Sequence, residues 1–130
     1  KKREIMLTNL LVDTNILIDF SKGKKQLLEE YSNEKEWQLW VNPVVMAEWL
    51  NNKELIDTGK LKKANEFIGE FNCAEIGKDE GKMTGKLIRN SQVDYLGDAL
   101  IAANCLVKKM YLLTRNQKHF KKIKGLKLLP

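Results

Sequence analysis

The sequence has one histidine, two cysteines and two prolines among its 130 residues. A structural zinc site takes about four cysteine or histidine ligands, and Cys73, Cys105 and His119 are too few and too widely spaced for one. No apolar run approaches the roughly 20 residues that cross a bilayer, and the Lys1-Lys2-Arg3 start lacks the apolar core of a signal peptide. There is also no glycine-rich phosphate loop. These absences argue against zinc-finger, membrane and P-loop proteins, and they predict a cytoplasmic protein.

Acidic residues are missing from the last quarter of the chain. After Asp98 there is no aspartate or glutamate, although residues 99–130 carry eight lysines and arginines. The first 98 residues hold the other 15 cations against all 17 acids, a net charge of −2. Such a cationic region attracts polyanions by neutralising phosphates and releasing counterions, although a solvated lysine-rich surface would have the same composition. The side chains expected to contact phosphates are Arg115, Lys118, Lys121, Lys122 and Lys124.

Short apolar runs alternate with helical patterns along the chain. Strands are expected at 9–12, 37–41, 110–113 and, more weakly, 71–76 and 126–129. Helices are expected at 16–20, 24–35, 79–90 and 98–107, with Asn42-Pro43 beginning another that runs to about Ile56 and Thr58 capping the next. This alternation predicts one α/β domain over residues 1–130, with three α/β/α layers and a mostly parallel sheet of four to five strands.

Two smaller expectations concern the cysteines and the chain start. Cys73 and Cys105 each lie in an apolar stretch, so both are expected to be buried free thiols. The chain does not begin with Met, whereas Met6 directly precedes the first apolar run. Residues 1–5 are therefore expected to be a terminal extension.

Oxygen-bearing side chains follow two of the expected strands. Asp13 ends the first strand, and Thr114 and Asn116 follow the strand at 110–113. Asp98 begins the apolar helix that precedes this second strand. Ligands of open α/β sheets bind outside the carboxyl ends of the strands. These groups therefore converge on one edge if the two strands are neighbours.

Glu48 carries further information about this edge. Helical periodicity places it on the same side as Val44 and Val45, so it is expected to face inward. An inward glutamate is costly unless something pairs with it, and a cation shared with Asp13 and Asp98 would do so. Oxygen ligands without imidazole or thiolate suit Mg²⁺ or Mn²⁺. Such an ion activates water for attack on a phosphodiester.

Purely structural roles remain open for each carboxylate. Asp13 is equally suited to capping the helix that follows it, Asp98 to complementing a helix N-terminus, and Glu48 to pairing with a lysine. If there is no metal site, all three carboxylates must have these purely structural roles at the same time. His119 is expected to pack with Phe120 or to bond a backbone group rather than to act in catalysis.

Four motifs follow one another along the chain: Leu11-Val12-Asp13-Thr14-Asn15, Asn42 to Leu50 around Glu48, Gly97-Asp98-Ala99-Leu100-Ile101-Ala102-Ala103, and Leu112-Leu113-Thr114-Arg115-Asn116 with His119-Phe120. In this order they resemble the motifs of the PIN-domain family, and the chain is similar in length and motif sequence to its VapC toxins. The resemblance implies a Rossmann-like fold and RNA cleavage that depends on Mg²⁺ or Mn²⁺. It also implies a homodimer that an antitoxin neutralises.

The resemblance assigns roles to individual positions. Asp13, Glu48 and Asp98 match the family's metal carboxylates, and Asn116 stands at a fourth position that is often Asp. All four are expected to be catalytic and to bind metal, with Thr114, Asn15 and Asp94 around them. The amide at 116 removes one negative charge, which weakens the case for two tightly bound metals.

Other protein classes fit less well. A haloacid-dehalogenase phosphatase needs a second aspartate two residues after the first, where this chain has Asn15. A receiver domain needs a phospho-accepting aspartate at its third strand, where the chain offers only Glu75. A PIN-like domain without turnover that binds RNA or protein through its basic region remains the alternative, because of Asn116.

Overall fold

The centre of the structure, a computed structural model that describes residues 6–130, is a sheet of five parallel strands. The strand order is β3-β2-β1-β4-β5. The strands are β1 (Thr8–Val12), β2 (Trp37–Val41), β3 (Asn72–Cys73), β4 (Tyr111–Leu113) and β5 (Leu128–Leu129). The predicted α/β fold with a parallel sheet of four to five strands is confirmed. The expected extension at residues 1–5 lies outside the described residues.

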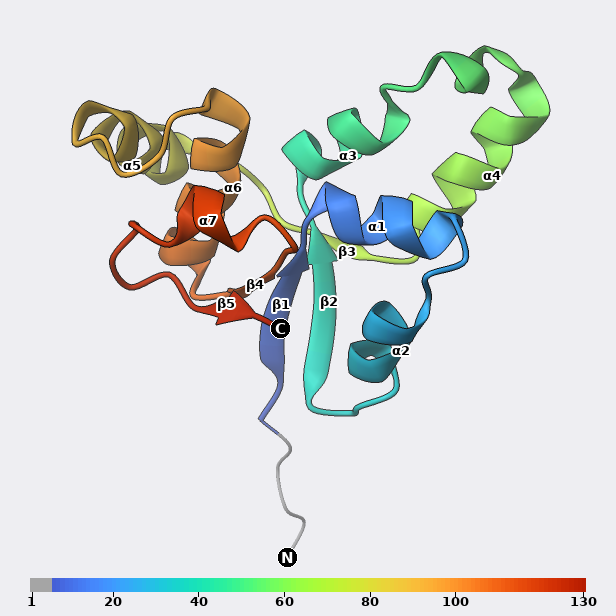
Figure 1. The fold of residues 1–130 in the computed structure, drawn as a ribbon, viewed down its shortest axis with the longest axis horizontal. Helices are drawn as coiled ribbons and strands as arrows, with labels where there is room; N and C mark the ends of the chain where they lie inside the picture. The colour runs from blue at the N-terminus through green and yellow to red at the C-terminus, as the bar shows by residue number, and fades with distance from the viewer. Residues whose placement is uncertain (1–5) are drawn as a thin grey trace, which may run out of the picture.

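Helices cover both faces of this sheet. From β1 the chain adds β2 and β3 in one direction, and it then crosses back to add β4 and β5 in the other. Since parallel crossovers are right-handed, the two directions place their helices on opposite faces. Figure 1 shows the two groups, with α5, α6 and α7 on the left and α1 to α4 on the right. The helices are α1 (Thr14–Ser21), α2 (Gln26–Ser32), α3 (Pro43–Leu50), the short 3₁₀ helix η1 (Lys53–Ile56), α4 (Thr58–Ile68), α5 (Lys78–Arg89), α6 (Leu96–Lys108) and α7 (Gln117–Phe120).

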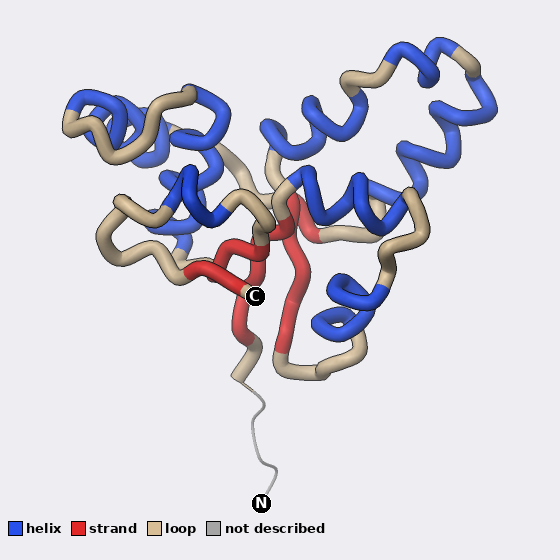
Figure 2. Tube along the Cα trace, in the orientation of Figure 1, coloured by secondary structure: helices blue, strands red, loops and turns tan. Residues whose placement is uncertain are grey.

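The central strand β1 carries the most buried part of the core. Leu10, Leu11 and Val12 are fully buried, as expected for an apolar run with helices on both sides. β1 pairs with β4 so that Val12 lies opposite Leu113, and both strands end at the same level. The strand order reverses at this pair, which is where α/β sheets open a crevice at their carboxyl edge. The arrows of β1 and β2 point toward the space between the two helix groups (Figure 1), and the tube view shows helices to either side of these strand ends (Figure 2).

The predicted helix from Pro43 to about Ile56 is wrong in its length. α3 ends at Leu50, and η1 follows after two asparagines. The side chain of Asn52 accepts a hydrogen bond from the backbone N–H of Glu54 at 3.0 Å. Asparagine side chains compete with helical hydrogen bonds in this way, so the pair ends one helix and caps the next.

Two smaller expectations also need correction, and one helix was missed. Asp57, not Thr58, caps α4 by accepting from the N–H of Lys60 at 3.0 Å. Of the two cysteines Cys105 is buried but Cys73 is exposed, because β3 is a two-residue strand at the sheet edge. The four-residue helix α7 was not predicted, since it is too short to show a period.

Among the described residues, no helix is long and apolar enough to span a membrane.

Candidate active site

Asp13 lies at the carboxyl end of β1 and is 5% exposed. Its Oδ1 accepts the backbone N–H of Thr14 at 2.8 Å, so it caps α1. Its Oδ2 accepts the hydroxyl of Thr114 at 2.7 Å and the amide of Asn15 at 3.1 Å. Burial raises the pKa of Asp13, and the charge of Asp98 adds to this, while the three hydrogen bonds oppose it. The capping role and a place in a polar cluster therefore both apply.

Thr114 and Asn15 tie the loops after β1 and β4 together. The hydroxyl of Thr114 is buried and also accepts hydrogen bonds from the amide of Asn15 at 3.2 Å and the backbone N–H of Asn116 at 3.1 Å. The side-chain oxygen of Asn15 in turn accepts the backbone N–H of Arg115 at 3.1 Å. Both predicted neighbours of Asp13 therefore hold it in place. The side chain of Asn116 is exposed at the start of α7 and makes no capping hydrogen bond.

Glu48 belongs to this edge, but the prediction that it faces into the core is wrong. The residue is exposed, and its carboxylate meets Thr14 of α1 instead of core side chains. Its Oε1 accepts the hydroxyl of Thr14 at 2.6 Å. A Cβ built on Gly97 would lie 3.6 Å from its Oε2, so the carboxylate meets the first turn of α6. This local shielding raises the pKa of Glu48, and the charges of Asp13 and Asp98 raise it further.

Asp98 stands in the first turn of α6 and pairs with His119. Its Oδ2 lies 3.1 Å from Nδ1 of His119, and the two side chains are 20% and 38% exposed. The expectation that His119 packs with Phe120 or the backbone is wrong. Phe120 is fully buried, and neighbouring residues of a helix point about 100° apart, so α7 turns His119 outward to Asp98. The contact between His119 and Asp98 was not predicted because the helix that orients His119, α7, was not predicted either.

The three predicted carboxylates therefore converge from three elements: the end of β1, α3 and α6. They are close enough that Asp98 raises the pKa of Asp13 and of Glu48, and Asp13 raises that of Glu48. Within residues 6–130, however, no three aspartate, glutamate, histidine or cysteine side chains form a ready-made metal cluster. Mg²⁺ keeps several waters and binds through one or two carboxylates. A hard cation therefore fits this all-oxygen donor set without direct contact to every member.

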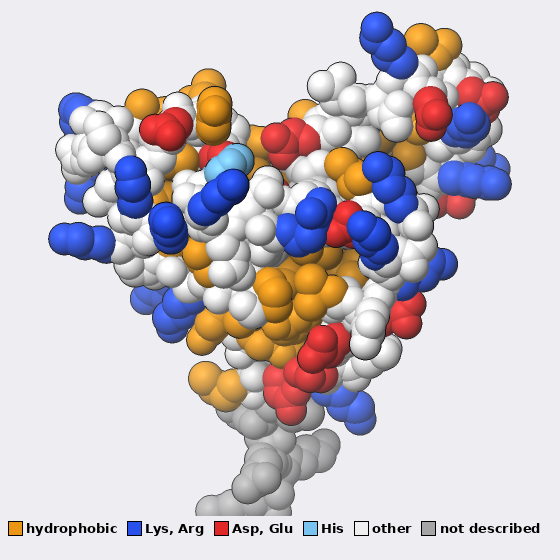
Figure 3. Space-filling view, in the orientation of Figure 1, with side chains coloured by type: hydrophobic (Ala, Val, Ile, Leu, Met, Phe, Trp, Pro, Cys, Tyr) orange, Lys and Arg blue, Asp and Glu red, His pale blue; other side chains and the backbone are white. Residues whose placement is uncertain are grey.

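The predicted phosphate-binding cations fall into three groups. Nε of Arg115 lies 2.5 Å from Asp19 of α1, so its charge is compensated inside the protein. Lys118 and Lys122 line a small cavity of about 90 Å³ beside Asp98, and the predicted neighbour Asp94 lines the same cavity. Lys121 and Lys124 are exposed but do not line it. In Figure 3 the histidine and acidic side chains lie at the hollow between the two helix groups, with blue cations around them.

A buried polar network behind the site was missed by the sequence analysis. Glu80 of α5 is 2% exposed and accepts the N–H of Gly77 at 3.0 Å and the amide of Asn104 at 3.1 Å. It also pairs with Lys108 at 3.3 Å. Burial alone raises the pKa of Glu80, but these hydrogen bonds outweigh it and lower the pKa below its ordinary value. Asn104 also accepts from Asn42, the cap of α3, at 3.0 Å, so the network joins the helices that carry Glu48 and Asp98.

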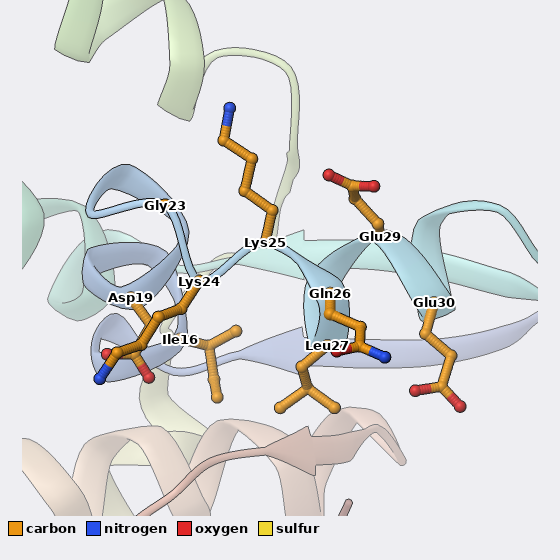
Figure 4. A pocket seen from close by; sticks show the side chains of 9 residues that line it. All are labelled: Ile16, Asp19, Gly23, Lys24, Lys25, Gln26, Leu27, Glu29 and Glu30. Carbon is orange, nitrogen blue, oxygen red and sulfur yellow. The ribbon is translucent and has the colours of Figure 1, made fainter.

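A larger cavity, of about 690 Å³, lies elsewhere, between α1 and α2. Ile16, Asp19 and Leu27 are among the residues that line it. Figure 4 shows the charged ends of Lys25 and Glu30 pointing away from each other rather than toward a shared point. Without convergent polar groups, this groove lacks the arrangement expected of a catalytic site, and the carboxylate edge is the better candidate.

Known proteins resemble this chain in sequence and in fold. The family model for the PIN domain matches residues 10–126. A ribonuclease VapC of Rickettsia bellii is 31% identical over 92% of this chain and 94% of its own length. Among solved structures, DNA-bound VapBC from Salmonella typhimurium aligns with a TM-score of 0.79 at 21% identity, covering 95% of this chain and 98% of that one. A toxin–antitoxin complex from Klebsiella pneumoniae aligns with a TM-score of 0.72 at 25% identity, covering 93% and 96%.

The resemblance drawn from four short motifs is thus confirmed over nearly the whole chain. The matched residues include all three carboxylates, Asp13, Glu48 and Asp98, and the loop after β4. The chain belongs to the PIN-domain family.

Proposed function

We propose that this protein is a metal-dependent endoribonuclease that hydrolyses RNA phosphodiester bonds. The observation that carries the proposal is the convergence of Asp13, Glu48 and Asp98 at the reversal point of the sheet. There the charge of Asp98 helps to raise the pKa of Asp13, and the charges of Asp13 and Asp98 help to raise the pKa of Glu48. Like charges gathered at one edge repel one another, and a bound cation would offset that repulsion. The ribonuclease VapC relative supports RNA as the substrate.

Asp13, Glu48 and Asp98 would hold Mg²⁺ or Mn²⁺, and Asn116 would add an amide oxygen or hold a bound water. When bound, such an ion stabilises the charge that builds up on the phosphate and eases deprotonation of an attacking water. The chain's own residues orient the carboxylates. Thr14 holds one oxygen of Glu48, and His119 holds one oxygen of Asp98, so each keeps its other oxygen without a hydrogen bond from a described residue.

The remaining parts of the proposal concern partners. The solved structures that align with this chain include complexes of toxins with antitoxins, so we expect an antitoxin to bind it and silence the nuclease. We also expect a homodimer that acts in the cytoplasm, with residues 1–130 working as one PIN domain. Lys118 and Lys122 beside Asp98 are placed to neutralise phosphates of the RNA, and we expect Lys121 and Lys124 to contribute from outside that cavity, whereas Arg115 pairs with Asp19.

One observation favours a second function. Asn116 replaces a fourth carboxylate, and its side chain stands in solvent at the start of α7. A PIN-like domain whose metal site has weakened in this way would bind RNA or a protein through its basic region without cutting.

The experiment is cleavage of a mixed pool of structured RNA by the purified protein in Mg²⁺, Mn²⁺ or EDTA. Asp98→Asn removes one carboxylate charge from the site, and Asp79→Asn makes the same change at an exposed residue of α5. We expect cleavage with either metal, none in EDTA, none by Asp98→Asn and full activity in Asp79→Asn. Equal activity of the two variants would refute the site. RNA binding without cleavage by folded wild-type protein would favour the second function.

A further inference from the structure

Tyr95 presents an exposed aromatic ring at the edge of the candidate site. It is 64% exposed, although large aromatic side chains are normally drawn into the interior. Its ring centroid lies 6.0 Å from that of His119, with the planes inclined by 47°. His119 in turn contacts Asp98. One open aromatic face therefore stands directly beside a proposed metal carboxylate.

Backbone hydrogen bonds fix the position of Tyr95 at the surface. Its carbonyl accepts the N–H of Ala99 at 2.9 Å, which is the first hydrogen bond of α6. Two residues earlier, Val93 is only 4% exposed and anchors the loop in the core. The N–H of Gln92 also bonds the carbonyl of Leu87 at 2.9 Å. The ring is thus held at the surface by an ordered turn, which lowers the entropy cost of using it as a contact.

The surroundings of Tyr95 suit a nucleic acid strand. Tyr95, His119, Lys118 and Lys122 line the same cavity of about 90 Å³, together with two acids, Asp94 and Asp98. This volume has room for about three waters, so a ligand ring would lie on the open face of the tyrosine rather than inside the cavity. The two lysines would neutralise phosphates on either side of a base placed there.

We propose that Tyr95 is the stacking platform for an unpaired base of the RNA, next to the phosphodiester that is cut. This inference rests on the proposed function and assigns the contact with the base to a residue that is not one of the proposed metal ligands. Every base offers a π-face to an aromatic side chain, and the contact tolerates any sequence. Bases inside a duplex are already stacked on their neighbours, so they cannot use the platform without being extruded.

The test compares binding of single-stranded and double-stranded RNA by fluorescence anisotropy in EDTA, where no metal is available for cleavage. The probe is an unstructured strand of about ten nucleotides, alone or annealed to its complement. The variants are Tyr95→Ala, Tyr95→Phe and, as matched control, Leu96→Ala. Leu96 is the next residue, 63% exposed and apolar but without a π-face. A thermal melt of each variant checks that it is folded.

We expect Tyr95→Ala to weaken binding of the single strand by a factor between about 5 and about 150. Its binding of the duplex should change little, and Tyr95→Phe and Leu96→Ala should both bind as the wild type does. A 2-aminopurine placed in the strand should be quenched by wild type and by Tyr95→Phe but not by Tyr95→Ala. That signal reports stacking itself and would not follow from a structural role.

Other outcomes overturn the inference in distinguishable ways. If wild type cuts and binds RNA and Tyr95→Ala binds equally well, the platform is refuted while the nuclease stands. If Leu96→Ala loses as much affinity as Tyr95→Ala, the pair is a general apolar surface, such as a contact for a protein, and not a stacking site. If the wild type neither binds nor cuts RNA, the proposed function fails first.

Discussion

Replacing Thr114 with valine tests how the two loops orient Asp13. Valine keeps nearly the same shape in this fully buried position but removes the hydroxyl. That hydroxyl donates to Oδ2 of Asp13 at 2.7 Å and accepts the backbone N–H of Asn116 at 3.1 Å. The carboxylate then keeps only two of its hydrogen bonds, those from Thr14 and Asn15.

The magnitude follows from the charge on the acceptor. A hydrogen bond to a charged group contributes roughly 1.5–3 kcal/mol, so we expect a loss of about 2 kcal/mol in the free energy of unfolding. Unfolding 130 residues at about 2.1 cal/mol/K per residue gives an entropy of about 0.27 kcal/mol/K, hence a Tm lowered by about 7 °C. Losing this bond also raises the pKa of Asp13 further. The difference in Tm should therefore shrink as the pH falls through the pKa of Asp13 and the carboxylate becomes neutral in both proteins.

The assay is a thermal melt at neutral and acid pH, together with metal affinity by calorimetry. Loss of an outer partner of a metal ligand typically costs about 10–100-fold in affinity or activity, and we expect Thr114→Val to fall in that range. Thr114→Ser is the control, because it keeps the hydroxyl and loses one methyl group. A Tm within about 2 °C of wild type would put the contribution of the hydroxyl below about 0.5 kcal/mol and refute the reasoning.

Two further predictions concern charge. Glu80→Gln should destabilise the protein by about 2 kcal/mol at neutral pH. Because the pKa of Glu80 is lowered, its stabilisation is present above its ordinary value of 4.5 and is lost as the pH falls through the folded pKa. Chemical denaturation curves of the variant and wild type should therefore converge in acid, and a constant gap would argue against the ionised pair with Lys108. The salt dependence of RNA affinity should also change, since Lys118→Gln or Lys122→Gln should lower the slope of log K against log salt by about 1. An unchanged slope would remove these lysines from the RNA path.

Much of the fold was predictable because its signals are local. The run Leu10-Leu11-Val12 followed by Asp13 indicates a buried strand that ends at a helix cap. Asn42-Pro43 indicates the start of a helix, whatever sheet surrounds it. The rule that ligands bind at the carboxyl ends of parallel strands then predicts that Asp13 and Thr114 lie close together, provided that β1 and β4 are neighbours. The pairing of β1 with β4 was the one condition, and the structure meets it.

The failures at the site depend on contacts between distant segments. Glu80 looks like a surface glutamate until Asn104 and Lys108 of α6 close over it. His119 was expected to pack with Phe120 or to bond a backbone group, yet only the turn of α7 decides that Phe120 is buried while His119 meets Asp98. The exposure of Glu48 likewise depends on how α3 sits beside α1, which helical periodicity cannot report.

The hydrogen bonds also decide which carboxylate gives the cleaner test of catalysis. Sequence reasoning treats Asp13→Asn and Asp98→Asn as equivalent. Asp13, however, is nearly buried and accepts three hydrogen bonds. Wherever an asparagine placed its NH₂ group there, it would face at least one donor, so the variant would disturb both the α1 cap and the link to β4. Asp98 bonds only His119 among the described side chains and is 20% exposed, so its asparagine variant can turn its oxygen to that ring. A loss of cleavage in Asp98→Asn with an unchanged Tm therefore reports the chemistry, whereas the same loss in Asp13→Asn would mix chemistry with the architecture of the crevice.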